Sequence, residues 1–426
     1  MIKDIIEIKQ GIKVHLIESK LFKTNMVCIL LTVPLLKETV TKNALIPFYL
    51  RSGTKNLPSQ IAINKKLEEM YGASFDCGID KMGDNQVLKF YIESINDNYT
   101  DKKENILKQT IDLLLEIIFN TNIKNNSFDE PVFELEKKNL KQVIEGKIDD
   151  KDLYAFENCI NAMYGENGFG IYKYGYIEDL DNINANVLSE HYSRLIQTAK
   201  IDIFVSGNLE NENVPDILRQ NENIQKLVPR AENYILNNEY TECKQKVDKI
   251  QEKQEEFDIS QGKLVMGLDI FSKQENLQCI ALVYNAILGD GANSMLFQNV
   301  REKASLAYSA KSKYVKQKGN IFIRCGIEIQ NYQKAVDIIK EQLENIRKGN
   351  FTEEDIENAK CYLISGIKMI EEEQDSEIVF QIGAEISKTY TTLKEYIDKI
   401  NNVSKDEIVE FANKTELNTI YFLTKK

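Results

Sequence analysis

The sequence predicts an α+β protein built from two tandem homologous domains, each an antiparallel-rich sheet covered by helices. One observation is composition: 42% of the 426 residues are apolar and only 6 are prolines, which is typical of a globular, helix-rich chain. A second is length, since a chain of this size forms about two to four domains. The third is an internal repeat, in which the order of segments in the first half returns in the second.

The repeated segments follow one order in both halves. A β-rich strand leads to an apolar helix that ends at glycine, then to a second amphipathic helix, a pair of strands and a long helix. Each half closes with a capped helix followed by a strand. The matched segments are 25–36 and 263–272, 42–54 and 277–291, 59–73 and 294–309, 74–94 and 310–330, 105–119 and 332–348, and 183–208 and 403–426. Gly83 and Gly319 are expected at the turns of the strand pairs.

The repeat also sets the expected domain limits. The first domain is predicted at residues 1–227 and the second at residues 261–426. Residues 228–260 between them are charged and weakly periodic, which is typical of a linker.

Composition excludes several classes of partner. The net charge of -12 argues against a nucleic-acid binder, which usually has a basic face. The seven cysteines are odd in number and form no CxxC pair, so we expect reduced, mostly buried thiols and a cytoplasmic protein. The N-terminus has no signal-peptide core, and the longest apolar run is about half as long as a membrane-spanning helix. No membrane partner is therefore expected.

The chain has only two histidines, His15 and His191. The zinc motifs HExxH and HxxEH need two histidines four residues apart on one helix face, so neither motif is present. Each histidine is expected to be a surface residue or a hydrogen-bonded one, and neither is expected to bind a metal.

The stretch GDGANSMLFQNVREKASLAYS, residues 289–309, is the candidate site. We expect a helix that ends near "REKAS" and a strand that begins at "LAYSAKS". The side chains of Arg301 and Tyr308 are expected on the wall of a cavity. The alternative is that the arginine belongs to a surface ion-pair cluster with Glu302 and Lys303 and that the tyrosine is core. The candidate residues are Arg301 and Tyr308, with Gly289, Gly291 and Ser294 as a supporting loop.

Two other kinds of site are disfavoured at this stretch. "GDGANS" lacks both the GxGxxG spacing and the GK[ST] of a nucleotide-binding loop, so a helix-terminating turn is expected. Ser294 has no histidine nearby in sequence, which argues against a catalytic triad.

The segment LGDGANSMLFQNVREKASLAYSAKS resembles the C-terminal-half motif of the pitrilysin/insulinase family of zinc peptidases, with its glycines, S-x-L-F and R-E-x-x-x-L-A-Y. Active members carry HxxEH shortly before a G-T pair in the first half. Here the pair is Gly53-Thr54, and counting back places residues 44–48, ALIPF, where HxxEH would lie, give or take one position. The candidates for the family's third ligand, a glutamate on a later helix, are Glu134, Glu136 and Glu145.

The resemblance implies an inactive homologue that binds no metal, because one carboxylate alone does not hold zinc. In two-chain relatives one subunit carries HxxEH and the other carries the arginine-tyrosine pair, and the two close as a clam shell. The resemblance thus implies a heterodimer in which Arg301 and Tyr308 hold the peptide substrate of a homologous zinc-bearing subunit. The alternative is a proteolytically inactive peptide-binding or assembly module.

A subgroup resemblance rests on three further segments. Residues 53–75, 133–159 and 164–180 are similar to Firmicutes members of this family that are named as associated with aminopentanol modification of elongation factor P. That name implies no mechanism.

Overall fold

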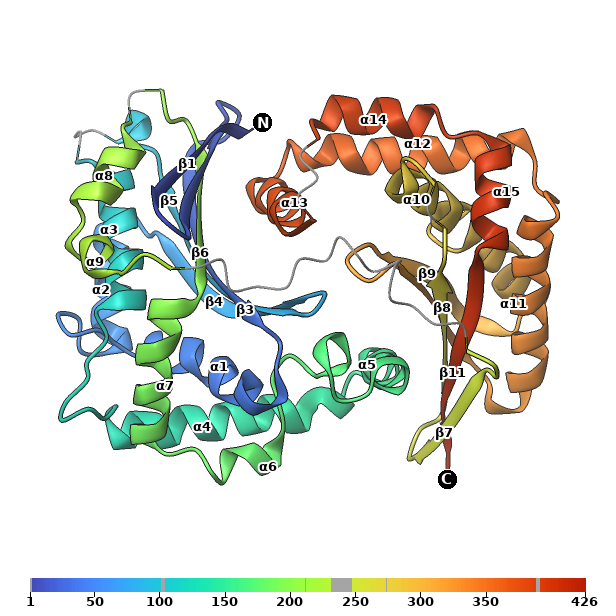
Figure 1. The fold of residues 1–426 in the computed structure, drawn as a ribbon, viewed down its shortest axis with the longest axis horizontal. Coiled ribbons are helices and arrows are strands. Elements are labelled where there is room, and N and C mark those ends of the chain that lie inside the picture. The colour runs from blue at the N-terminus through green and yellow to red at the C-terminus, as the bar shows by residue number, and fades with distance from the viewer. Residues whose placement is uncertain (1, 101–103, 211, 231–246, 273, 388–390) are drawn as a thin grey trace. The chain divides into compact units, whose positions relative to one another are not determined.

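The computed structural model describes residues 2–100, 104–210, 212–230, 247–272, 274–387 and 391–426 (Figure 1). The chain divides into two compact units. Unit 1 comprises Met1–Gly146, Asn167–Ile235 and Glu372–Gln381, and unit 2 comprises Lys147–Glu166, Leu236–Glu371 and Ile382–Lys426. Each unit holds one sheet and its helices, which confirms the predicted α+β class.

The sheet of unit 1 has six strands in the order β1-β2-β6-β3-β5-β4. The β2–β6 pair is parallel and the other neighbours are antiparallel. Alternate residues such as Ile12, Val14 and Leu16 face the core, as the two-residue period of a strand requires. The strands are β1 (Ile2–Lys9), β2 (Ile12–Glu18), β3 (Thr24–Pro34), β4 (Ser74–Met82), β5 (Asn85–Ile95) and β6 (Lys200–Gly207).

Helices cover one face of this sheet, where their apolar sides form one core with the strands (Figure 1). The helices of unit 1 are α1 (Lys37–Leu50), α2 (Gln60–Glu69), α3 (Ile106–Phe119), α4 (Glu130–Glu145), α6 (Ile177–Leu180), α7 (Ala185–Thr198), α8 (Val214–Gln220) and α9 (Glu222–Lys226).

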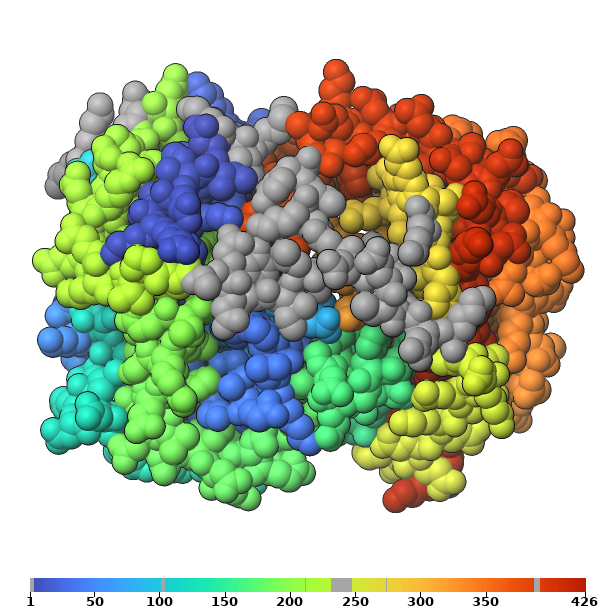
Figure 2. All heavy atoms as spheres, viewed as in Figure 1, coloured from blue at the N-terminus to red at the C-terminus, as the bar shows by residue number. Residues whose placement is uncertain are grey.

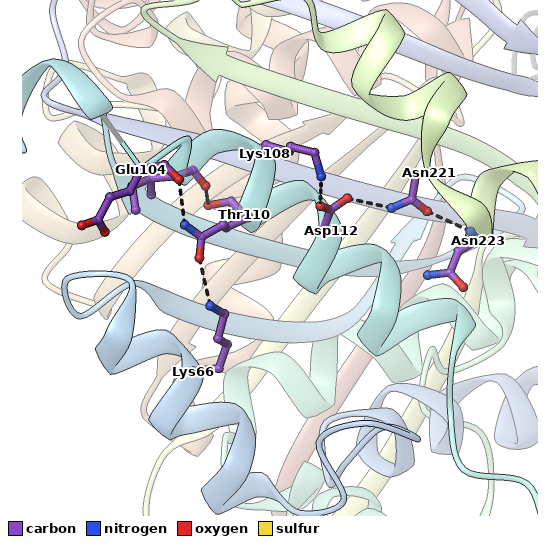
Figure 3. Close-up of polar contacts among 9 residues, drawn as sticks. Lys66, Glu104, Lys108, Thr110, Asp112, Asn221 and Asn223 are labelled. Carbon is purple, nitrogen blue, oxygen red and sulfur yellow. Dashed lines mark hydrogen bonds and ion pairs between the residues drawn. The ribbon is translucent and has the colours of Figure 1, made fainter. Parts of the chain in front are cut away.

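Polar side chains join the outer sides of these helices around α3 (Figure 3). Lys66 of α2 donates to Gln109 at 2.9 Å. Asp112 pairs with Lys108 one turn away and accepts a hydrogen bond from Asn221 Nδ2 at 2.8 Å. Because Asn221 also caps α9, these contacts connect three helices of the layer.

The sheet of unit 2 has five strands in the order β7-β11-β8-β10-β9. The β7–β11 pair is parallel and the others are antiparallel. The strands are β7 (Gln251–Phe257), β8 (Gly262–Ile270), β9 (Ala307–Val315), β10 (Asn320–Ile327) and β11 (Thr415–Lys425). The helices are α5 (Lys151–Tyr164), α10 (Leu277–Leu288), α11 (Tyr332–Arg347), α12 (Glu353–Ile370), α14 (Leu393–Asn401) and α15 (Lys405–Asn413), and α13 (Gln374–Ser387) has residues in both units.

The two sheets have the same topology once β1 is set aside. The order β2-β6-β3-β5-β4 in unit 1 matches β7-β11-β8-β10-β9 in unit 2, and each has one parallel pair at the same place. The turns of the strand pairs fall at Gly83 and Gly319, with φ of 58° and 57°. The tandem repeat of similar domains is therefore confirmed.

Two features differ from the sequence-based division of the chain. Residues 251–257 of the expected linker form β7, an edge strand with mostly exposed side chains (Figure 2). Its residues are mostly charged or polar and do not alternate with apolar residues as in a half-buried strand. The sequence therefore did not predict a strand there. Helix α5, which precedes that linker, belongs to unit 2. Residues 231–246 of the linker lie outside the described residues.

Two findings concern the whole described part of the chain. None of its helices combines the length and apolar character that crossing a membrane requires. Its six cysteines are unpaired: Cys28, Cys159, Cys279 and Cys325 are buried, Cys77 is half-buried and Cys361 is exposed. Cys243 lies outside the described residues.

Candidate functional site

Arg301 lies on an unusual helical segment. Residues Phe297–Lys303 form a π-helix, a rare conformation that is often found at functional sites. The Arg301 guanidinium stacks on the Phe297 ring, 4.7 Å from its centroid. Its Nε lies 3.6 Å from the Glu302 carboxylate, and 45% of the side chain is exposed. The arginine is thus a surface residue oriented by an aromatic ring, and it makes the ion pair with Glu302 that was the alternative expectation.

Tyr308 is the extra residue of a β-bulge. In the β9–β10 pair Ser309 lies opposite Gly326 and Ala307 lies opposite Ile327, so Tyr308 has no partner. A bulge re-aims a side chain and occurs often beside active sites. Tyr308 is 70% exposed and is therefore not a core residue. As expected, the helical segment ends at Lys303 and the strand begins at Ala307.

A cavity of about 880 Å³ lies beside Tyr308 within unit 2. Its wall combines amide, hydroxyl and charged groups with two isoleucines, and Arg301 is not part of it. The lining residues are Ser260, Gln261, Tyr308, Ile327, Glu328, Ile329, Gln330 and Lys425.

The local structure explains the residues of the supporting loop. At Gly289, the C-cap of α10, a Cβ would lie 2.7 Å from the backbone nitrogen of Ser312, so only glycine fits there. Gly291 has a φ of +133°, which favours glycine. Ser294 is buried and donates to the Gly291 carbonyl at 2.7 Å. Gly291 and Ser294 line a separate cavity of about 180 Å³ together with Asp290 and Tyr362. The five candidate residues therefore do not share one cavity.

The positions expected for HxxEH lie in α1, in unit 1. Ala44 is fully buried in the core, and Pro47 stands inside the helix where the general-base glutamate would be. The Pro47 carbonyl accepts hydrogen bonds from the Arg51 backbone nitrogen and from the Cys77 thiol. Phe48 stacks under the Arg51 guanidinium, 5.0 Å away. Shifting the alignment by one residue in either direction introduces no histidine or carboxylate.

Glu136 is the one of the three candidate glutamates that faces α1. It is 5% exposed, whereas Glu134 and Glu145 are exposed. Its carboxylate accepts hydrogen bonds from Ser52 Oγ at 2.8 Å and Asn139 Nδ2 at 2.9 Å, and it lies 3.5 Å from Arg51 Nη2. These groups do not fit zinc, because the single carboxylate is already compensated by a cation and two donors. Within the described residues no three His, Cys, Asp or Glu side chains are placed to hold a metal.

Both histidines are buried and hydrogen-bonded. His15 Nε2 lies 2.9 Å from Asp202 Oδ1, which neighbours the buried Lys200. His191 lies on the buried side of α7, and its Nε2 is 2.6 Å from Asn43 Oδ1. Burial lowers the pKa of His191 to about 4, with small contributions from nearby cations. Both imidazoles are therefore structural residues of unit 1.

Sequence reasoning missed Phe297 and Arg51. Phe297 precedes Arg301 by four residues, one helical turn, so this spacing is the signal that predicts their stacking. Arg51 gave no such signal, because its partner Glu136 lies on another helix.

Comparisons with known proteins agree with this picture. Residues 182–363 match the family model described as "Peptidase M16 inactive domain". The chain is 32% identical to the "Probable inactive metalloprotease YmfF" of Bacillus subtilis, over 97% of this chain and 96% of that one. It is 23% identical to the "Uncharacterized zinc protease YmxG" of the same organism, over 77% of each. Among solved structures, a conserved protein from Enterococcus faecalis V583 is similar with a TM-score of 0.89 and 28% identity, over 99% of this chain and 98% of that one.

Proposed function

Because this chain belongs to the M16 family of peptidases, we propose that it is the non-catalytic subunit of a two-chain zinc metallopeptidase. In this assembly a homologous subunit with HxxEH holds the zinc and cleaves peptides. The present chain contributes Arg301 and Tyr308, which bind the substrate in the partner's active site.

The broader part of the proposal rests on the family. The resemblance to pitrilysin/insulinase peptidases is confirmed, and so is the prediction that the chain is an inactive homologue of a zinc metallopeptidase. The proline and phenylalanine at the HxxEH positions agree with this, since a peptidase of this kind needs both the ligands and the general base. The elongation factor P subgroup and the cytoplasmic location stay predictions.

The proposed substrate-binding role rests mainly on Tyr308. A tyrosine buries about 150–250 Å² when it packs in a core, so a 70% exposed tyrosine at a bulge has no stabilising reason to be there. Its hydroxyl makes no hydrogen bond to another described residue, and its cavity of about 880 Å³ is large enough for several residues of a peptide. A free phenol is a suitable donor to a substrate carbonyl.

Arg301 supplies a positive charge to the proposed substrate-binding site. A guanidinium has five N–H donors, and the ion pair with Glu302 is long and half-exposed, so most donors remain available. Stacking on Phe297 limits the orientations of the side chain and so reduces the entropy lost on binding. The zinc of the partner would supply the Lewis acid and the activated water, and these two side chains would hold the carbonyl oxygen as charge develops on it.

The proposal is tested by complementation. This chain and a zinc-bearing homologue encoded in the same genome are purified separately and then mixed. We expect a stable heterodimer that cleaves peptides, while neither chain alone does so at a comparable rate. A homologue that is fully active alone and is unaffected by this chain would contradict the proposal.

A second candidate is a peptide-binding or assembly module without proteolysis. One observation favours it: Arg301 does not line the cavity that Tyr308 lines. Under this alternative the two chains co-purify, but the zinc-bearing subunit gains no activity from the association.

A further inference from the structure

We propose that Gln342 of helix α11 is a positioning residue for Arg301. It holds the π-helix Phe297–Lys303 in the backbone register that places the Arg301 guanidinium on the Phe297 ring. All of these residues belong to unit 2, so the positioning is a property of this chain alone. Its consequence for substrate binding rests on the proposed function.

Gln342 is a polar residue at a position of α11 where the helical pattern predicts an apolar one. It is 4% exposed, and it is the one polar member of the buried side of this helix. An apolar side chain would pack there without needing hydrogen bonds, so stability alone does not explain the amide. A buried polar residue can instead fix the register of its neighbours. The buried side of α11 consists of Ala335, Val336, Ile339, Gln342, Leu343 and Ile346.

The Gln342 amide contacts the residue that closes the π-helix. Its Oε1 accepts a hydrogen bond from Asn299 Nδ2 at 2.9 Å. The backbone carbonyl of Asn299 accepts from the backbone nitrogen of Ala304 at 3.2 Å, and this five-residue spacing defines a π-helix. Gln342 is therefore bonded to the residue whose carbonyl spans the turn that contains Arg301.

The register of this turn determines where Arg301 lies relative to Phe297. In an α-helix the Asn299 carbonyl would accept from Lys303, four residues further on. Because a π-helix closes its turn one residue later, a change of register alters the angle between residues four apart, such as Phe297 and Arg301. The stacking at 4.7 Å therefore belongs to the π-helical register that Gln342 stabilises.

Arginine modification of the purified full-length chain tests the positioning without a partner. Phenylglyoxal reacts with guanidinium groups, and peptide mass spectrometry gives the rate at each arginine. The rate at Arg301 is divided by the rate at Arg219, whose side chain is 51% exposed against 45% for Arg301. Gln342→Met removes the acceptor and keeps a similar volume. We expect it to raise this ratio about two- to fivefold, as loss of an exposed cation–π contact does.

Three further variants define the outcomes. Phe297→Leu removes the ring itself and should raise the ratio to the same extent. Gln342→Glu keeps an oxygen acceptor for Asn299 Nδ2 and should leave the ratio near that of the unmodified chain. Gln333→Met is the matched control, because Gln333 is an exposed glutamine of the same helix that donates to Asp337.

Three results overturn the inference. One is an equal ratio in Gln342→Met and Gln333→Met. Another is a ratio that Phe297→Leu leaves unchanged, since the ring would then not hold the guanidinium. The third is a ratio that Gln342→Glu raises as much as Gln342→Met does.

Melting temperatures separate positioning from a merely structural role. In Gln342→Met the Asn299 Nδ2 keeps its hydrogen bond to the Met295 carbonyl at 2.9 Å, so this donor is not left without an acceptor. The melting temperature should therefore change little. A lower melting temperature with an unaltered arginine ratio would mean that Gln342 is only structural, which contradicts the inference.

The assembled pair tests the consequence for substrate binding. With a zinc-bearing homologue, Gln342→Met should lower kcat by about two- to fivefold. It should have no further effect in a chain that already carries Arg301→Ala, because it acts through that arginine. A decrease by the same factor in both backgrounds contradicts the inference. If no active pair forms, the proposed function fails, whereas the arginine ratio still decides whether Gln342 positions Arg301.

Discussion

Glu255 of strand β7 accepts a hydrogen bond from the hydroxyl of Tyr154 of helix α5, at 2.7 Å. The same carboxylate accepts from Asn158 Nδ2 at 3.3 Å and from the Tyr421 hydroxyl. A helix that precedes the expected linker is thereby fixed to the sheet of unit 2 by a residue from within that linker. The sequence repeat alone did not reveal this connection.

Removing this carboxylate should loosen α5. We expect Glu255→Ala to lower the free energy of unfolding by about 1–3 kcal/mol, because it leaves the Tyr154 and Tyr421 hydroxyls without an acceptor and removes one of the two acceptors of Asn158 Nδ2. Glu256→Ala is the control, since Glu256 is an exposed neighbour on the same strand. Urea unfolding and limited proteolysis within residues 147–166 are the measurements. Equal stability and equal cleavage in the two variants would show that the cluster does not hold the helix.

A pair of glycine substitutions should act in opposite directions. In Gly289→Ala the new Cβ would lie 2.7 Å from the backbone nitrogen of Ser312, so the turn after α10 must shift. We expect a loss of about 1–3 kcal/mol. Gly366 lies within α12 with nothing within 4 Å of a Cβ, so Gly366→Ala should stabilise by about 0.5–1 kcal/mol. Thermal melts of both variants check the signs, and destabilisation by Gly366→Ala would contradict the assignment of open space.

Acid should destabilise unit 1 through His191. Burial lowers its folded-state pKa to about 4, whereas an unfolded histidine titrates at about 6.5. Between these values the unfolded chain binds more protons, so stability is fully present above about pH 6.5 and is lost as the pH falls towards 4. We expect His191→Gln to reduce this pH dependence. Urea unfolding at pH 7.5 and pH 5 gives the change in the free energy of unfolding between these pH values. An equal change with and without the histidine would refute the attribution to His191.

Metal content is a separate expectation. Because Glu136 is engaged by Arg51, Ser52 and Asn139, the purified chain should hold no stoichiometric zinc. Elemental analysis after dialysis checks this, with a zinc-bearing homologue prepared in parallel. About one tightly held zinc per chain would contradict both the conclusion that the groups around Glu136 do not fit zinc and the assignment of the chain as a non-catalytic subunit.

Much of the fold was predictable because it depends on local patterns repeated twice. The strand pairs around Gly83 and Gly319 and the apolar helix that ends at Gly289 have recognisable periods and turn residues. Strand β7 was not predictable, because an exposed edge strand satisfies its backbone through β11 without apolar side chains. The placement of α5 was hidden for a related reason, since an amphipathic pattern does not specify which sheet the helix contacts.

The candidate site was predictable only in part. The motif indicated Arg301 and Tyr308, and the change from helix to strand between them followed from residue types. The exposure of Tyr308 depends on a bulge, and a bulge is a property of register with β10, which one strand's sequence does not contain. Choosing Glu136 among three glutamates likewise required knowing which side of α4 faces α1.

The activity of the assembled pair tests the central claim most directly. The double variant Arg301→Ala/Tyr308→Phe is combined with the zinc-bearing subunit, and kcat is measured with a saturating peptide substrate. Loss of one such donor typically costs about 10²–10³ in rate, so we expect a decrease of at least that size with assembly unchanged. The control combines Arg219→Ala with Tyr99→Phe, an exposed arginine and an exposed tyrosine of unit 1, and should leave kcat unaltered. An unchanged kcat in the Arg301/Tyr308 variant would contradict the in-trans role and favour the binding module.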